Sequence, residues 1–158
     1  MSEIAYRLPD EPAPGKLQQL AVNPLWPLLG VMFCGSWLAF PWFAINGFAL
    51  GSATRIRELI IAVSYFLGAC LVVVFLSYCV AMEWLPEEYL KYALQILVLW
   101  KLGLAYWLFF LQPTALQLYK YIGGTVRNGV LLLVFAAIFL RERVLALSDF
   151  GLWILVMS

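Results

Sequence analysis

Histidine does not occur among the 158 residues of this chain, and only 12% of the residues are charged. Without histidine, the chain lacks the commonest general base, the usual ligand of zinc and haem iron, and the side chain that titrates near neutral pH. It also lacks paired aspartates for intramembrane proteolysis, an HExxH motif and a GxxxxGK phosphate loop. We therefore expect no enzymatic activity, no catalytic or metal-binding residues and no organic cofactor.

Cysteine is also scarce. Cys34, Cys70 and Cys79 all lie inside apolar runs, and no CxxC pattern occurs, so these thiols are expected to pack as small hydrophobic side chains. The nearest cluster of carboxylates is around Glu83 and Glu87, where Pro86 interrupts any helical turn. This cluster indicates a solvated acidic loop rather than a metal site.

Apolar residues, by contrast, make up 65% of the chain, well above the roughly 45–50% typical of soluble domains. So much apolar surface must face lipid, and the sequence predicts an all-α integral membrane protein, in a bacterial inner membrane or an organellar membrane. A net charge of +1 without a basic block gives no reason to expect nucleic-acid binding. The expected partners are membrane lipids, including bound lipid, and other membrane protein subunits.

The chain divides into a proline-containing extramembrane tail, residues 1–23, and a helical membrane domain, residues 24–158. Four apolar segments predict four transmembrane helices, because about 20 apolar residues cross a bilayer. These segments cover about residues 25–50, 59–82, 90–111 and 129–157, and they form two hairpins, residues 25–82 and 90–157.

The last segment leaves two readings open. It is purely apolar only from Gly129 to Leu140 and then meets Arg141, Glu142 and Arg143. Either the helix stops there and an amphipathic extension lies along the interface, or it continues and remains membrane-embedded with the charges at membrane depth.

Positive charge is concentrated in two of the three connections between segments. Arg55 and Arg57 follow the first segment and Arg127 follows the third, whereas the second connection is acidic. The positive-inside rule places the two basic connections in the cytoplasm and the acidic one, with both termini, outside. Arg55, Arg57 and Arg127 are expected to contact lipid headgroups or a partner protein.

A shift of 72 residues superimposes Pro41 on Pro113 and the stretch GSATR, residues 51–55, on GGTVR, residues 123–127. Two small residues followed by an arginine suit a tight turn between helices at the membrane surface. The match predicts two parallel helical-hairpin repeats. Coincidence in an apolar chain is the alternative.

Lys101 lies near the middle of the third segment, where a charge costs about 2.5–3.5 kcal/mol. We take the third helix to leave the membrane at the cytoplasmic face near Gln112 and the fourth to re-enter it near Leu131. Lys101 and Glu142 then both lie about 16 Å below that face. We therefore predict an intramembrane pair of Lys101 and Glu142, within one chain or across a subunit boundary. By the same reasoning Glu58 lies near the interface, at the wrong depth to pair with Lys101.

These features favour a non-enzymatic, small polytopic membrane protein that acts as an accessory or structural subunit of a larger membrane complex. One alternative is a small oligomeric channel or carrier that uses Lys101, although only Asn46, Gln95 and Asn128 accompany it as polar lining. A second alternative is an immunity or modulatory protein that binds a partner's transmembrane helices.

Overall fold

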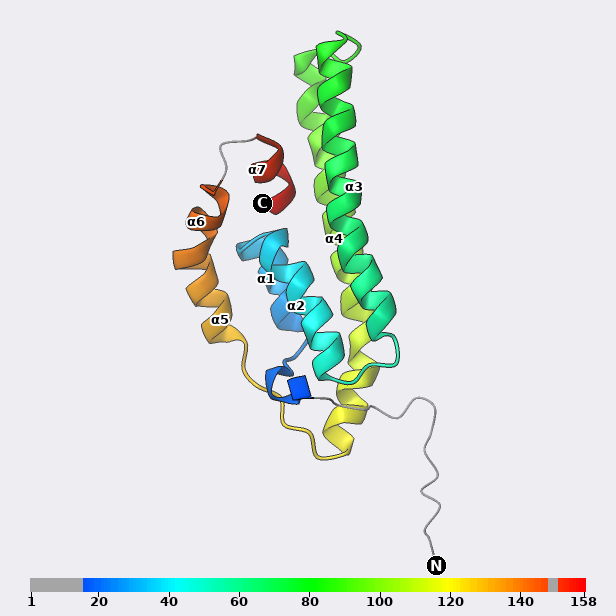
Figure 1. The fold of residues 1–158 in the computed structure, drawn as a ribbon, viewed down its shortest axis with the longest axis vertical. Coiled ribbons are helices and arrows are strands. Elements are labelled where there is room, and N and C mark those ends of the chain that lie inside the picture. The colour runs from blue at the N-terminus through cyan, green and yellow to red at the C-terminus, as the bar shows by residue number, and fades with distance from the viewer. Residues whose placement is uncertain (1–15, 148–150) are drawn as a thin grey trace, which may run out of the picture.

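The structure is a computed structural model that describes residues 16–147 and 151–158. Every regular element in these residues is a helix, which confirms the all-helical prediction (Figure 1). Of the predicted tail, residues 1–15 lie outside the described part, and Lys16–Leu20 form a short 3-10 helix, η1.

The longest elements are α3 (Arg55–Ala81) and α4 (Glu87–Tyr121), which form an antiparallel hairpin. At about 1.5 Å per residue they are about 40 and 52 Å long, enough to cross a bilayer. The turn between them uses Glu83 at φ 58° and places Pro86 just before α4, where its missing N–H removes no helical hydrogen bond. α4 continues through Pro113, ten residues beyond the predicted end near residue 111.

The prediction of one helix over residues 25–50 is wrong. The chain forms two short helices, α1 (Leu25–Phe33) and α2 (Ser36–Ala49), which pack against each other as a hairpin. Gly35 makes the reversal with φ 105°, a conformation that residues with a Cβ rarely adopt. Two of the four expected spans, α3 and α4, are therefore present as single helices long enough to cross a membrane. The other two expected spans are not shown.

The helix continues past Leu140, as one of the two expected paths has it, but it ends at Leu145. The helical path runs without a break through α5 (Val130–Phe135), a π-helical turn η2 (Ala136–Leu140) and α6 (Arg141–Leu145). The chain then turns back, and α7 (Gly151–Met157) packs against α2 and α3, between α6 and the long hairpin (Figure 1).

The predicted repeat has the same turn at both of its matching positions. Gly51 has φ 66° and Gly123 has φ 86°, and each follows a helix end closed by the same pair of backbone hydrogen bonds. The helices before these turns differ, because α1 and α2 fold back on each other whereas α4 is continuous. The repeat of whole hairpins stays a prediction.

The core lies where α2 packs against the lower halves of α3 and α4. Phe40 and Phe43 are fully buried there, and the ring of Phe40 stacks on Tyr65 with 4.1 Å between the centroids. The upper half of the α3–α4 hairpin extends beyond this core (Figure 1).

Candidate functional site

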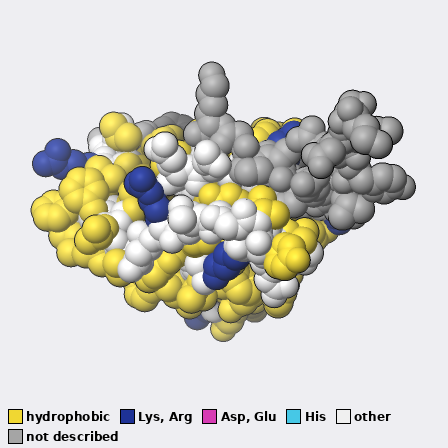
Figure 2. Space-filling view, turned by 90° about the horizontal axis from the view of Figure 1, so that it is seen from below, with side chains coloured by type: hydrophobic (Ala, Val, Ile, Leu, Met, Phe, Trp, Pro, Cys, Tyr) yellow, Lys and Arg dark blue, Asp and Glu magenta, His cyan; other side chains and the backbone are white. Residues whose placement is uncertain are grey.

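Four basic side chains lie together at one end of the molecule. The α2–α3 turn and the α4–α5 loop lie together at this end, below the core in Figure 1, with Arg55, Arg57, Lys120 and Arg127 in or beside them. Seen from below in Figure 2, the charged side chains visible among the described residues of this face are lysine and arginine. The glutamates of the α3–α4 turn lie at the opposite end of the long hairpin. We call the first end the basic end.

Two of these arginines lie over aromatic rings. The Arg57 guanidinium is 5.4 Å from the centre of the Trp107 ring, and that of Arg55 is 5.9 Å from the Phe48 ring. Such contacts hold a cation beside an apolar surface.

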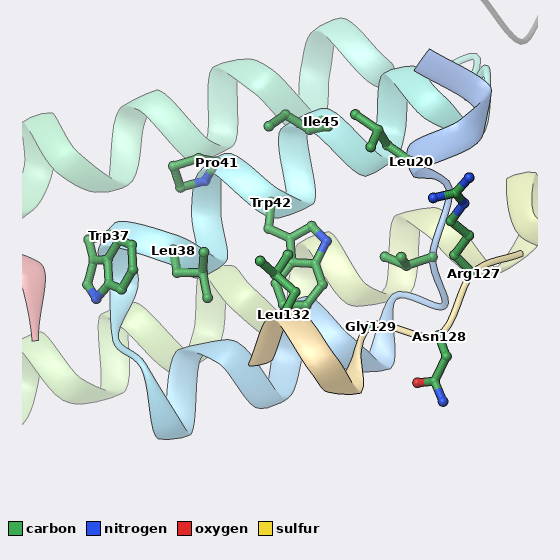
Figure 3. A pocket seen from close by; sticks show the side chains of 11 residues that line it. Leu20, Trp37, Leu38, Pro41, Trp42, Ile45, Arg127, Asn128, Gly129 and Leu132 are labelled. Carbon is green, nitrogen blue, oxygen red and sulfur yellow. The ribbon is translucent and has the colours of Figure 1, made fainter. Parts of the chain in front are cut away.

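An apolar groove opens at the basic end and runs along α2 (Figure 3). It has a volume of about 310 Å³ and lies between α2, η1 and the first turn of α5. Trp37 lies at one end of the groove and Arg127 at the other, with Leu38, Pro41 and Ile45 between them (Figure 3). Arg127 and Asn128 are the polar side chains of the lining, apart from the indole N–H groups.

The backbone around Arg127 is fixed by contacts to the N-terminal segment. The Arg127 N–H donates to the Ala21 carbonyl at 2.8 Å. Gly129, two residues later, lies so close to two indoles that an added Cβ would be 2.6 Å from Trp26 and 2.9 Å from Trp42. A glycine is therefore required for the loop to close one end of the groove.

A fully buried polar network lies behind the groove. The Val22 N–H donates to Asn46 Oδ1 at 2.9 Å, and Asn46 Nδ2 donates to Gln112 Oε1 at 2.8 Å. Gln112 Nε2 then donates to the Phe43 carbonyl at 2.8 Å and to Glu58 Oε2 at 2.7 Å. The network therefore links the groove wall to α2, α3 and α4.

Glu58, at 0% exposure, is the only carboxylate in this network. The hydroxyls of Ser52 and Thr54 reach its Oε1 at 2.7 and 2.8 Å. Its position in the first turn of α3 adds the favourable end of the helix dipole. Both carboxyl oxygens of Glu58 therefore have hydrogen-bond donors, as a buried polar group requires.

Gly47 provides the space for this carboxylate, because a Cβ at that position would overlap Glu58 Oε2. No buried side-chain N or O atom in the described residues lacks a hydrogen-bond partner. The network is thus complete in itself, and in the described part of the chain no group of three His, Cys, Asp or Glu side chains is placed to hold a metal.

The structure does not bring Lys101 and Glu142 together within the chain. Lys101 Nζ donates to the Ser158 backbone carbonyl at 3.1 Å, while Glu142 is exposed on α6. The carbonyl of Val156 in α7 accepts from Tyr65 Oη at 3.0 Å and from Ser36 Oγ. Lys101 therefore helps to hold the end of α7, and a pair with Glu142 across a subunit boundary stays a prediction.

Sequence reasoning missed the buried network. It placed Glu58 at the interface because the residue begins a helix, and it considered Asn46 only as possible pore lining. The available signal was a polar residue inside each of two apolar runs, Asn46 beside Gly47 and Gln112 beside Pro113. Their meeting depends on the reversal at Gly35, which composition does not reveal.

Comparisons with protein-family models, with curated proteins and with solved structures found no match.

Proposed function

We propose that this protein is a non-enzymatic integral membrane protein that serves as an accessory subunit, packing through its α3–α4 hairpin against another membrane protein. α3 and α4 cross the bilayer in a bacterial inner membrane or an organellar membrane. The shorter α1–α2 and α5–α7 hairpins enter from the basic end and turn back, in place of two further full crossings.

The observation that carries this proposal is the bare apolar surface of the hairpin. Only 28% of the most apolar stretch of α3 and 17% of that of α4 are buried by the rest of the chain. Leu71 and Phe75 on α3 and Leu99 on α4 are 62–71% exposed. Surface of this kind needs lipid or protein around it.

One feature of α4 favours a protein neighbour in addition to lipid. Gly103 has no atom within 4 Å of where a Cβ would lie, so it leaves a shallow gap on an exposed helix face. The exposed rings of Tyr106 and Phe110 stack beside it with 6.4 Å between centroids. Small residues next to large ones let transmembrane helices approach closely and interlock.

A photo-crosslinking amino acid at position 103 tests the proposal in cells. We expect the chain to resist carbonate extraction from membranes and to form one discrete protein adduct on illumination. The same amino acid at Lys91, outside the apolar face, is the control and should give no such adduct. Carbonate extraction of the chain, or adducts with lipid alone, would refute the proposal.

The two other functions suggested by the sequence receive different support. A channel or carrier would need Lys101 to face a pathway, and the cavity beside Lys101 has a volume of about 100 Å³, with the ammonium group bonded to Ser158. An immunity or modulatory protein differs from an accessory subunit in the identity of its partner, which the adduct at position 103 would reveal.

A further inference from the structure

We infer that the groove along α2 binds an acyl chain of an anionic phospholipid, whose phosphate lies against Arg127. The inference rests on the membrane placement proposed above and assigns a specific lipid site that an accessory subunit does not require. It is argued from the shape of the groove, from the charge at one of its ends and from its position in the molecule.

The groove has the form expected for an amphipathic ligand. It is elongated along α2, apolar from Trp37 through Leu38 and Ile45, and charged only where Arg127 lies (Figure 3). Its volume of about 310 Å³ is at the lower end of the range for small-molecule sites. A purely apolar occupant would leave the arginine unused, and a small polar anion would leave the apolar length empty.

The charged end of the groove presents the Arg127 guanidinium to a phosphate. No ion pair occupies the Arg127 guanidinium in the described residues, and the side chain is exposed. The neighbouring Asn128 side chain points away from Arg127 (Figure 3), and its Oδ1 accepts from the Val130 N–H at 3.0 Å, so Arg127 is the donor at this end. A guanidinium suits phosphate oxygens because it can donate two parallel hydrogen bonds.

The position of the groove matches that of a lipid in a leaflet. Its charged end lies at the basic end, with Arg55 and Arg57, and its apolar end lies toward the reversal at Gly35, near mid-height of the molecule (Figure 1). Anionic lipid is concentrated in the cytoplasmic leaflet, on the side where the positive-inside rule places this end. Charge complementarity therefore favours an anionic phospholipid over a zwitterionic one or a second copy of this basic surface.

Native mass spectrometry of the purified full chain tests the inference. The chain is freed of lipid in mild detergent and mixed with equal amounts of phosphatidylglycerol or phosphatidylcholine. We expect one retained phosphatidylglycerol and weaker phosphatidylcholine binding. Arg127→Gln should weaken phosphatidylglycerol binding about fivefold, the effect of one charge near an anionic surface, and Arg127→Lys should retain most of it. Arg143→Gln, an exposed arginine on α6, is the matched control.

A second pair of variants tests the apolar part independently of charge. Ile45→Trp fills the groove and should abolish the retained lipid, whereas Leu131→Trp, at an 80% exposed position outside the lining, should not. Equal retention of both lipids, or unchanged binding in Arg127→Gln and Ile45→Trp, would overturn the inference. So would displacement of the lipid by millimolar inorganic phosphate, which would indicate a site for a free anion. Carbonate extraction of the same variants reports separately on membrane placement, which all of them should retain.

Discussion

The carboxylate of Glu58 is fully buried, so its stability depends on the donors that converge on it. In Glu58→Ala, Gln112 Nε2 and the Ser52 and Thr54 hydroxyls lose their common acceptor, and we expect a loss of about 3 kcal/mol of unfolding free energy. In Glu58→Gln, one amide oxygen still accepts from Gln112 and the amide N–H₂ donates to the hydroxyls, so the loss should be about 1 kcal/mol. Thermal unfolding in detergent measures both, with Glu88→Ala at an exposed carboxylate as the control. Equal stability of the two Glu58 variants would contradict the described network.

Two glycines provide a matched test of the space around this carboxylate. Gly47→Ala forces a Cβ onto the Glu58 carboxylate and should lower the unfolding free energy by about 2 kcal/mol. Gly103→Ala meets open space within an exposed helix and should be neutral, or stabilising by up to about 1 kcal/mol. In detergent, the unfolding temperature of Gly47→Ala should therefore fall, and that of Gly103→Ala should stay the same or rise. A tolerated Gly47→Ala would mean that Glu58 lies elsewhere.

Among the elements, α7 and the Ser158 that follows it accept hydrogen bonds from side chains of three other helices, α2, α3 and α4. Lys101→Met removes the charged donor to the Ser158 carbonyl and should loosen α7 by about 2 kcal/mol. A cysteine at position 155 should then react faster with maleimide, after Cys34, Cys70 and Cys79 have been replaced. Lys91→Met is the control, because Lys91 lies over the Tyr92 ring at the exposed start of α4.

The same variants separate this role from the predicted ion pair. If Lys101 acts only on α7, adding Glu142→Leu to Lys101→Met changes nothing. If Lys101 and Glu142 meet across a subunit boundary, the double variant should assemble better than the single one, since a lone buried charge is removed.

The elements also show which parts of the fold sequence patterns predict. α3 and α4 were predicted because each is a continuous apolar run, and hydropathy reports such runs directly. The α1–α2 reversal was not predicted, because hydropathy measures composition and does not report the direction of the chain. Gly35 alone changes that direction, and it looks like any other small residue in the segment. Within the chain, Lys101 and Glu142 do not meet for a different reason. The depth argument assumed that the fourth helix packs against α4, whereas α6 packs against α7, and α7 brings the Ser158 carbonyl to Lys101.

The two ends of the whole molecule differ in charge and in how much of their apolar surface is covered. The buried network, the charged end of the groove and the side chains of Arg55, Arg57 and Arg127 lie at the basic end, while the bare apolar hairpin extends toward the acidic α3–α4 turn. The network joins Val22, which lines the groove, to α2, α3 and α4 through buried hydrogen bonds. A groove wall tied to three helices suits a fixed lipid site, and an uncovered hairpin suits a partner.

This asymmetry predicts the orientation of the chain in the membrane. In a background without native cysteines, single cysteines at Ala53 and Tyr121 lie in or beside the two basic connections, and one at Trp84 lies in the acidic turn. Because basic connections are retained in the cytoplasm, the first two should react with a membrane-impermeant maleimide only after the cytoplasmic face is opened, and the third should react in intact cells. The distance along α3 between the two ends, about 40 Å, exceeds the hydrocarbon thickness of about 30 Å, so the two groups of sites cannot share one side if α3 spans. Labelling of all three from the same side would show that the hairpin does not cross, and labelling of position 84 from the cytoplasm would reverse the orientation and move the groove to the outer leaflet.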